Sequence, residues 1–457
     1  MFHCRRQSPP ASSGFEKPTM HTSEVAQSIF TGIVLVAAFT AMARFRFNQA
    51  VVMPLAAAIL VASRGAGAPS IIDAVAREIG HVALVLAAVA VPAHQIQGSG
   101  LFGVCGARLG ATTGRLMLRR PRLCVAAFIF TILVAVAVSA AFLHNITSVL
   151  VWTAPTIMIC RSFRLPPRFI LCGIVVASNL GGFTTRWGDT PNIIEAKAWA
   201  LTNGAFVSEI LPVNALALAC LAAGITWLTR RTMRNDGVED DLQHAVETAA
   251  FLQEARETSI DRRRLLTGVL ALSGFLLVQL WIPRLEVAAA AGAIFIAVLG
   301  ERAEFRLPSL YAIGPDVVGT LAAVFAVAAC ITRSPLGAIL SNLIASTGGA
   351  VWAVALSSYV GTGLTEAASW AAAAAEVTHN VNAGHAAAWA LGAGICAGSS
   401  SVLTAASAGI IVAGESSRFP GEELSFRSYL PFGIGASILM LAFYVVVLTI
   451  LQQAGAF

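Results

Sequence analysis

Long apolar stretches are the feature that most constrains what this chain can fold into. A helix needs about 20 apolar residues to cross the hydrocarbon core of a bilayer, and many stretches here approach that length. Of the 457 residues, 57% are hydrophobic and 12% are charged, whereas a soluble globular chain carries about 25% charged residues. These values exclude a cytosolic enzyme, a nucleic-acid module and a secreted disulfide scaffold. They predict an all-α polytopic membrane protein with spans near 26–43, 49–63, 79–97, 205–229, 264–282, 284–299, 316–332, 350–374 and 431–452.

The formal net charge of +6 does not indicate a nucleic-acid partner. Its arginines lie mostly in short loops beside apolar spans, where they bias membrane topology, and they form no basic stripe. The eight cysteines contain no CxxC pair, and nearly all lie in or near apolar runs. We interpret them as small buried apolar residues, neither disulfides nor zinc ligands.

Composition divides the chain into four segments. Residues 1–24 form a polar N-terminal tail without the apolar core of a signal peptide, and translation could start at Met1 or Met20. Residues 25–229 and 265–457 form two membrane repeats. Residues 230–264 form a charged linker, and the arginines near its ends favour the cytoplasmic side. We expect a multi-pass protein of a cell inner (plasma) membrane.

Two regions do not fit simple spans. Residues 123–160 are too long for one crossing and contain a polar interruption at 144–148, which predicts a re-entrant helical hairpin. Residues 178–192 combine glycines with Arg186, Asp189 and a proline, which cannot face lipid because unpaired backbone and charge are costly there. Such backbone occurs at membrane depth where it lines a polar cavity, as in the discontinuous helices of transporters.

An internal repeat links the two halves. At one constant offset Gly181 falls on Gly398 and Thr184 on Ser401, while Asp189 falls on Ala406. The first half keeps ionisable and amide groups, whereas the second supplies mainly hydroxyls. A binding site at the repeat interface is therefore expected to be chemically asymmetric.

The segment 178–192 resembles the Asn-x-Gly-Gly…Gly-Asp-x-Pro-Asn signature of the ion-transporter superfamily, in the branch of arsenite permeases and sodium/proton antiporters, which is related to citrate-transporter-like permeases. Residues 141–145 resemble that branch's Ala-Phe-Leu-Asp-Asn segment, with His144 in place of Asp, and residues 408–414 resemble its Ala-Asn-Val-Val-Val-Ala-Gly. The resemblance covers about residues 25–455. It implies two inverted repeats, each with a re-entrant hairpin and a discontinuous helix, that move small ions or anions by alternating access.

Several candidate residues have two interpretations. Asp189 could bind sodium or exchange a proton, or it could cap the helix that follows. Asn179 and Asn192 could offer amide oxygens to a cation or satisfy backbone groups freed by the break. Arg186 could contact an anionic substrate, pair with Asp189 or extend to the membrane interface. His144 could shuttle protons or be structural.

A further acid, Glu366, lies in an apolar stretch of the second half. It could replace the acid missing from that half, or it could lie at the membrane interface. The sequence contains no nucleophile–base pair, Walker loop or HExxH motif, so it predicts no enzyme. The candidate ion- or substrate-binding residues are His144, Asn145, Thr147, Ser178, Asn179, Gly181, Gly182, Thr185, Arg186, Gly188, Asp189, Asn192, Ser399, Ser400 and Ser401, with Asp189 and Asn145 as candidate sodium ligands.

These residues favour a secondary active transporter of small ions. Sodium/proton antiport is the first choice, because oxygen donors suit hard cations. A proton- or sodium-coupled permease for arsenite or a carboxylate such as citrate is the alternative, supported by Arg186 and the hydroxyl-rich second half. A transport-inactive scaffold and a passive channel are further alternatives. The expected partners are Na⁺ or H⁺ as the coupling ion, the lipid bilayer and a second copy of the chain. No other cofactor is expected.

Overall fold

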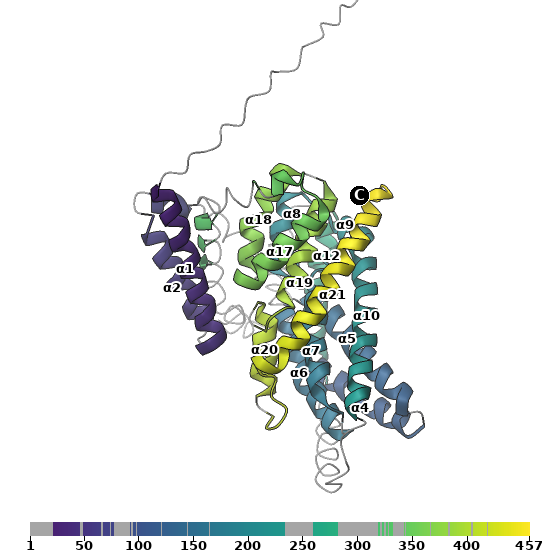
Figure 1. Cartoon of the computed structure of the whole chain (residues 1–457). Coiled ribbons are helices and arrows are strands. Elements are labelled where there is room, and N and C mark those ends of the chain that lie inside the picture. Colours follow the sequence, from purple (N-terminus) through teal and green to yellow (C-terminus); the bar gives the residue numbers. More distant parts are fainter. Residues whose placement is uncertain are drawn as a thin grey trace, which may run out of the picture.

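The computed structural model describes residues 22–45, 49–64, 101–119, 121–143, 145–163, 165–233, 259–281, 344–365, 367–382, 384–403, 405–417 and 419–457, with scattered positions between 67 and 100 and between 319 and 342. These residues form helices joined by turns (Figure 1). The predicted spans at 284–299 and most of 79–97 and 316–332 lie outside the described residues. His144, Glu366 and the linker between 234 and 258 lie outside them as well.

Within the described part of the chain, three helices are long and apolar enough to cross a membrane. They cover Cys124–Leu143, Asn203–Thr232 and Phe426–Gln453. Shorter apolar helices accompany them, including Pro167–Gly182. The prediction of an all-α membrane protein with several spans is therefore confirmed.

The N-terminal helices α1 (Thr22–Phe45) and α2 (Gln49–Ala62) pack against each other at one side of the molecule (Figure 1). Their apolar core includes Leu60 and reaches Ala373 in the second half of the chain. The first half continues with α4 (Leu101–Arg119), and the second half begins with α12 (Arg262–Trp281).

A helical hairpin and a broken helix follow α4. The hairpin consists of α5 (Pro121–Leu143) and α6 (Asn145–Ser162), which meet at the predicted polar interruption. The broken helix consists of α7 (Pro167–Gly182) and α8 (Thr190–Ala198). The short helix α9 (Asn203–Ala205) and a π-helical turn at Phe206–Ile210 then lead into α10 (Leu211–Met233).

The second half has the same order of elements. Helices α17 (Val351–Thr365) and α18 (Ala367–Val381) form a pair, α19 (His385–Ser399) and α20 (Ser407–Ser416) form a broken helix, and α21 (Phe426–Gln453) follows. The prediction of a single span at 350–374 is wrong, because this run is divided between α17 and α18. The Trp370 ring occupies the space that a side chain at Gly361 would fill, so α17 and α18 pack closely against each other.

The repeat is visible in the way these elements pack. The first helix of each pair packs against the broken helix of its own half, α5 against α7 and α17 against α19. Gly181 lies against the Ala137 backbone and Gly398 against Thr362, so a glycine allows a close approach between helices at both of these equivalent positions. After each break the arrangement crosses over: α8 packs on α18 of the other half, and α20 packs on α6. This reciprocal packing is compatible with inverted repeats.

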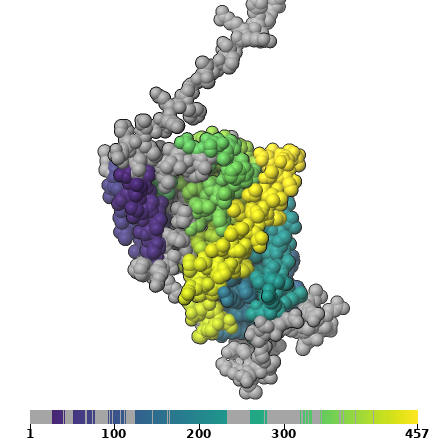
Figure 2. All heavy atoms as spheres, in the orientation of Figure 1, coloured from purple at the N-terminus to yellow at the C-terminus, as the bar shows by residue number. Residues whose placement is uncertain are grey.

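Helix α21 closes the assembly. In Figure 2 it runs along the surface beside both halves, in contact with green and teal helices. Two large apolar clusters fill the interior. One is centred on Trp389 and Tyr444, and the other on Phe128 and Tyr429. Both clusters combine residues from the two halves, so the breaks are held inside one packed body.

Candidate functional site

The first helix break, residues 183–189, is anchored by Asp189. This residue has extended backbone (φ −146°, ψ 152°) and is the N-cap of α8, where its Oδ1 accepts a hydrogen bond from the Thr190 N–H at 2.9 Å. The carboxylate thus satisfies a backbone donor and places a negative charge at the positive end of the helix dipole. The capping interpretation holds, because Oδ1 accepts from the first N–H of α8.

Asn192 holds the break together. Its Nδ2 donates to the Gly182 carbonyl at 2.7 Å and to the Thr185 carbonyl at 2.6 Å. Both acceptors belong to backbone freed where the helix stops, so its amide nitrogen has the structural role considered from the sequence.

The hairpin tip is joined to this break. The Asn145 N–H donates to the Gly188 carbonyl at 3.2 Å, and Thr185 Oγ1 donates to the Ala141 carbonyl at 2.6 Å. Ser148 Oγ, one turn further along α6, donates to the Val136 carbonyl of α5. These bonds hold the α5–α6 tip beside the turn that precedes α8.

Two buried amide oxygens near this junction accept no hydrogen bond. They are Oδ1 of Asn145 and Oδ1 of Asn179, and these residues are 3% and 2% exposed. A buried acceptor without a donor is costly. It can be satisfied by a cation or by a ligand that carries a donor. Asn179 also joins the two halves, because its Nδ2 donates to Ser400 Oγ at 3.0 Å.

The second break lies between α19 and α20 and has a different character. Ala406 occupies the N-cap of α20, where no side chain caps the helix. The three serines before it donate within their own turn: Ser399 and Ser400 to the Cys396 carbonyl, and Ser401 to the Gly398 carbonyl. Their hydroxyl protons are therefore engaged, whereas the N-terminus of α20 carries no side-chain acceptor. The Tyr429 hydroxyl fixes the Ser400 carbonyl at 2.8 Å.

The remaining candidates lie on the same elements. Ser178 is buried on α7 and donates to the Val175 carbonyl. Thr147 is half-buried on α6, and Arg186 is half-buried in the first break. The structure thus brings the described candidates to two breaks and one hairpin tip.

A polar connection that was not predicted from the sequence lies behind the first break. Asn214 of α10 donates to the Leu180 carbonyl at 3.1 Å and to Thr184 Oγ1 at 3.2 Å. The Tyr444 hydroxyl donates to Asn214 Oδ1 at 2.5 Å. A lone asparagine inside the apolar run 205–229 was the signal that could have revealed it.

Two acidic residues were missed as well. Glu209 accepts from Trp389 Nε1 at 2.7 Å and lies 3.1 Å from His385 Nδ1, so it connects the π-helical turn to the start of α19. Glu195 of α8 is completely buried. Within the described residues, no three His, Cys, Asp or Glu side chains gather as a metal site would require.

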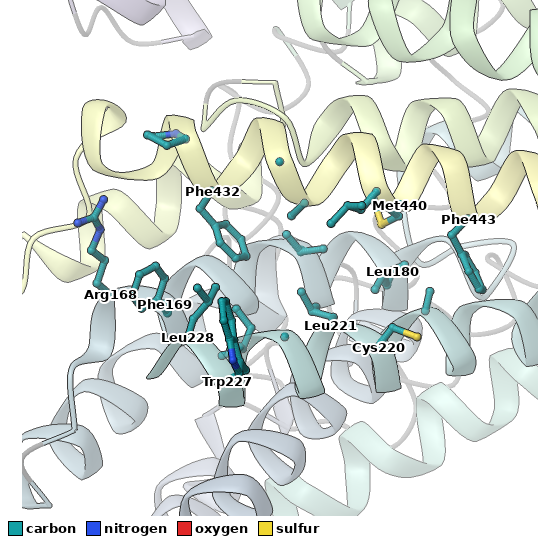
Figure 3. A pocket seen from close by; sticks show the side chains of 18 residues that line it. Arg168, Phe169, Leu180, Cys220, Leu221, Trp227, Leu228, Phe432, Met440 and Phe443 are labelled. Atoms are coloured by element: carbon teal, nitrogen blue, oxygen red, sulfur yellow. The ribbon is translucent and has the colours of Figure 1, made fainter. Parts of the chain in front are cut away.

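A cavity of about 760 Å³ lies outside this polar region, between α7, α10 and α21 (Figure 3). Its walls are apolar side chains such as Phe169, Trp227, Phe432 and Met440. Arg168 lies at one end and donates to the Ser428 carbonyl. None of the candidate residues lines this cavity, so it is separate from the two breaks.

Helices long enough to span a membrane, combined with two buried helix breaks, are an arrangement typical of membrane transporters. A family model described as a citrate transporter matches residues 33–394, which is most of the chain. The chain therefore belongs to the citrate transporter family, and the resemblance found in its signature residues is confirmed. The family is described as one of transporters, which agrees with the transporter class predicted from the sequence and not with an enzyme.

Individual relatives cover only parts of the chain. The human P protein is 31% identical over 163 residues, which are 33% of this chain and 20% of that protein. An uncharacterised transporter of Mycobacterium bovis is 36% identical over 87 residues, which are 19% of this chain and 20% of the relative. The chain thus matches 20% of the length of these curated relatives.

A solved structure supports the fold. The chain is similar to the Alcanivorax borkumensis YdaH transporter, whose structure is described as having an unusual topology. The TM-score is 0.51 and the sequence identity 16%, and the match covers 82% of this chain and 85% of that one.

Proposed function

We propose that this chain is a cation-coupled transporter of a small carboxylate anion. The observation that carries the proposal is the contrast between the two breaks. A carboxylate, Asp189, caps α8, whereas the equivalent N-cap of α20 is the uncharged Ala406. One half of the site therefore suits a cation and the other an anion.

The first half offers oxygen acceptors. The unpartnered oxygens of Asn145 and Asn179 and the second oxygen of Asp189 belong to the elements that meet at the first break. Amide and carboxylate oxygens are ligands that hard cations prefer. Sodium would be bound directly by such oxygens, and a proton would be carried by Asp189.

The second half offers a positive helix end. The N-terminus of a helix presents backbone N–H groups and a partial positive charge that favour an anion, and α20 has no side-chain carboxylate in that place. Thr362 adds a buried hydroxyl without a hydrogen-bond partner. The description of the family as citrate transporters supports a carboxylate over arsenite as the anion.

Sodium/proton antiport is the second candidate. The observation in its favour is that Asn145, Asn179 and Asp189 provide oxygen acceptors for a cation, and no anion is needed for that cation to bind. For either function we propose a bacterial-type inner membrane as the location and a homodimer as the assembly.

The proposal is tested with purified protein in proteoliposomes. Uptake of labelled citrate and of arsenite is measured under an imposed sodium gradient, pH gradient or neither, and sodium-driven proton movement is measured without any anion. Gradient-dependent citrate uptake is the expected result. Proton movement with sodium alone would establish antiport instead. If no ion or anion moves in any condition, both proposed functions are overturned.

Asp189→Asn tests the cation half. Asparagine caps a helix as well as aspartate does, so this change removes the charge and keeps the cap. We expect gradient-driven uptake to fall at least tenfold. Asp261→Asn is the matched control, because Asp261 accepts from the backbone N–H groups of Arg263 and Arg264 at the start of α12, away from the breaks. Equal activity of the Asp189→Asn variant and the wild type would contradict the assignment.

A further inference from the structure

Glu195 is a buried acid that the function described so far does not use. It lies on α8, it is 0% exposed, and neither of its carboxylate oxygens has a hydrogen-bond partner. Buried carboxylates in proteins are normally paired or hydrogen-bonded. An acid without either partner inside a transporter needs a physical explanation.

The carboxylate lies at the contact between the two halves. Its Oε2 is 2.6 Å from the position that a Cβ on Gly392 would occupy, and the Phe183 ring borders the same position. Gly392 belongs to α19, the broken helix of the second half. Because glycine has no side chain, this position of α19 leaves the space into which Glu195 extends.

Among the residues that the structure describes, the ionisable groups that interact electrostatically with Glu195 do not supply a compensating positive charge. Asp189 and Cys396 interact with it electrostatically, and both become negative when they lose a proton. Four other charged or titratable residues are described on α8 or on the helices packed against it. Glu376 of α18 and Lys197 of α8 are exposed. The His379 ring lies against Trp199, and His385 contacts Glu209.

An ionised carboxylate in this place would be desolvated and uncompensated, which is a strongly unfavourable state. Protonation removes the charge. Sodium would require several oxygen ligands, but the groups known to border Oε2 are Gly392 and an aromatic ring. The chemistry of the site therefore favours a proton over a metal ion.

We propose that Glu195 is a proton-carrying site of the transport cycle, separate from the ion site at the first break. Glu195 takes up a proton from water on one side of the membrane before α8 packs against α19, and in the present conformation it is held as the carboxylic acid. When the two halves move apart and water reaches the side chain, the O–H bond breaks and the proton passes to water. This inference rests on the proposed function, because it adds one proton to each cycle of the transporter.

The number of protons per transported anion tests the inference. It is obtained from the membrane voltage that just stops citrate uptake at a fixed pH gradient in proteoliposomes. The wild type is expected to move one proton more per citrate than Glu195→Gln, while exchange of internal for external citrate is retained in the variant. Glu376→Gln is the matched control and should keep the wild-type proton number. An unchanged proton number in Glu195→Gln would overturn the inference.

A second measurement does not depend on transport. The infrared C=O band of a protonated carboxylic acid is recorded for purified wild type, Glu195→Gln and Asp189→Asn at neutral pH. The inference requires a band that is present in the wild type and in Asp189→Asn but absent from Glu195→Gln. If this band is present while no anion is transported, the proposed function fails and the protonated state of Glu195 stands. If it is absent from the wild type, the inference fails whatever the transport result.

Discussion

The second break allows a direct test of where the anion binds. Ala406 has φ −140° and ψ 147°, and Asp189 has φ −146° and ψ 152°. Since these two N-cap positions share one backbone conformation, Ala406→Asp should cap α20 as Asp189 caps α8. The substitution would then place a negative charge where we propose that the substrate's negative charge is held.

The expected loss of affinity for the anion follows from electrostatics. A carboxylate at the N-cap lies about 6 Å from an anion bound to the first-turn N–H groups, and two unit charges at that distance repel by about 3 kcal/mol at an effective dielectric constant of about 20. This corresponds to a loss of affinity of about 100-fold. The cap itself should stabilise the helix by about 1 kcal/mol, so the protein should remain folded.

The assay is the citrate concentration dependence of uptake in proteoliposomes, compared with Ala406→Asn. Asparagine provides the same cap without the charge, so any loss specific to the aspartate variant is electrostatic. We expect the citrate concentration at half-maximal uptake to rise about 100-fold in the Ala406→Asp variant and to change little in Ala406→Asn. If both variants behave like the wild type, or if both lose uptake equally, the anion does not bind at the N-terminus of α20.

Two further predictions concern the packing that supports the site. Gly181→Ala should lower the stability of the detergent-solubilised protein by about 1–3 kcal/mol, because the added Cβ would meet the Ala137 backbone. Gly224→Ala, where a Cβ meets nothing, is the control in the thermal unfolding measurement. Equal melting temperatures of the two variants would contradict the close approach at Gly181. Tyr444→Phe removes the donor to Asn214 Oδ1 and should cost about 1–3 kcal/mol, measured by the same method; an unchanged melting temperature would show that this hydrogen bond contributes little.

The first hairpin and the first break could be predicted because polar residues interrupt apolar runs there. The second hairpin could not, since 350–374 reads as one apolar span and its turn is visible only in the packing of Trp370 against Gly361. Glu195 was missed for a related reason. A glutamate in a short polar helix normally faces water, and its burial depends on Gly392, which is distant in the sequence.

The crossed packing of the two half-helices has a consequence for biosynthesis. The first half of the chain is synthesised before α18 and α20 exist, so α8 and α6 at first lack the helices that later cover them. During that interval Glu195 has no α19 against which to be buried. The first half is therefore an incomplete intermediate in the membrane, and its packing is completed only when α21 has been made, because Tyr444 of that helix donates to Asn214 of the first half.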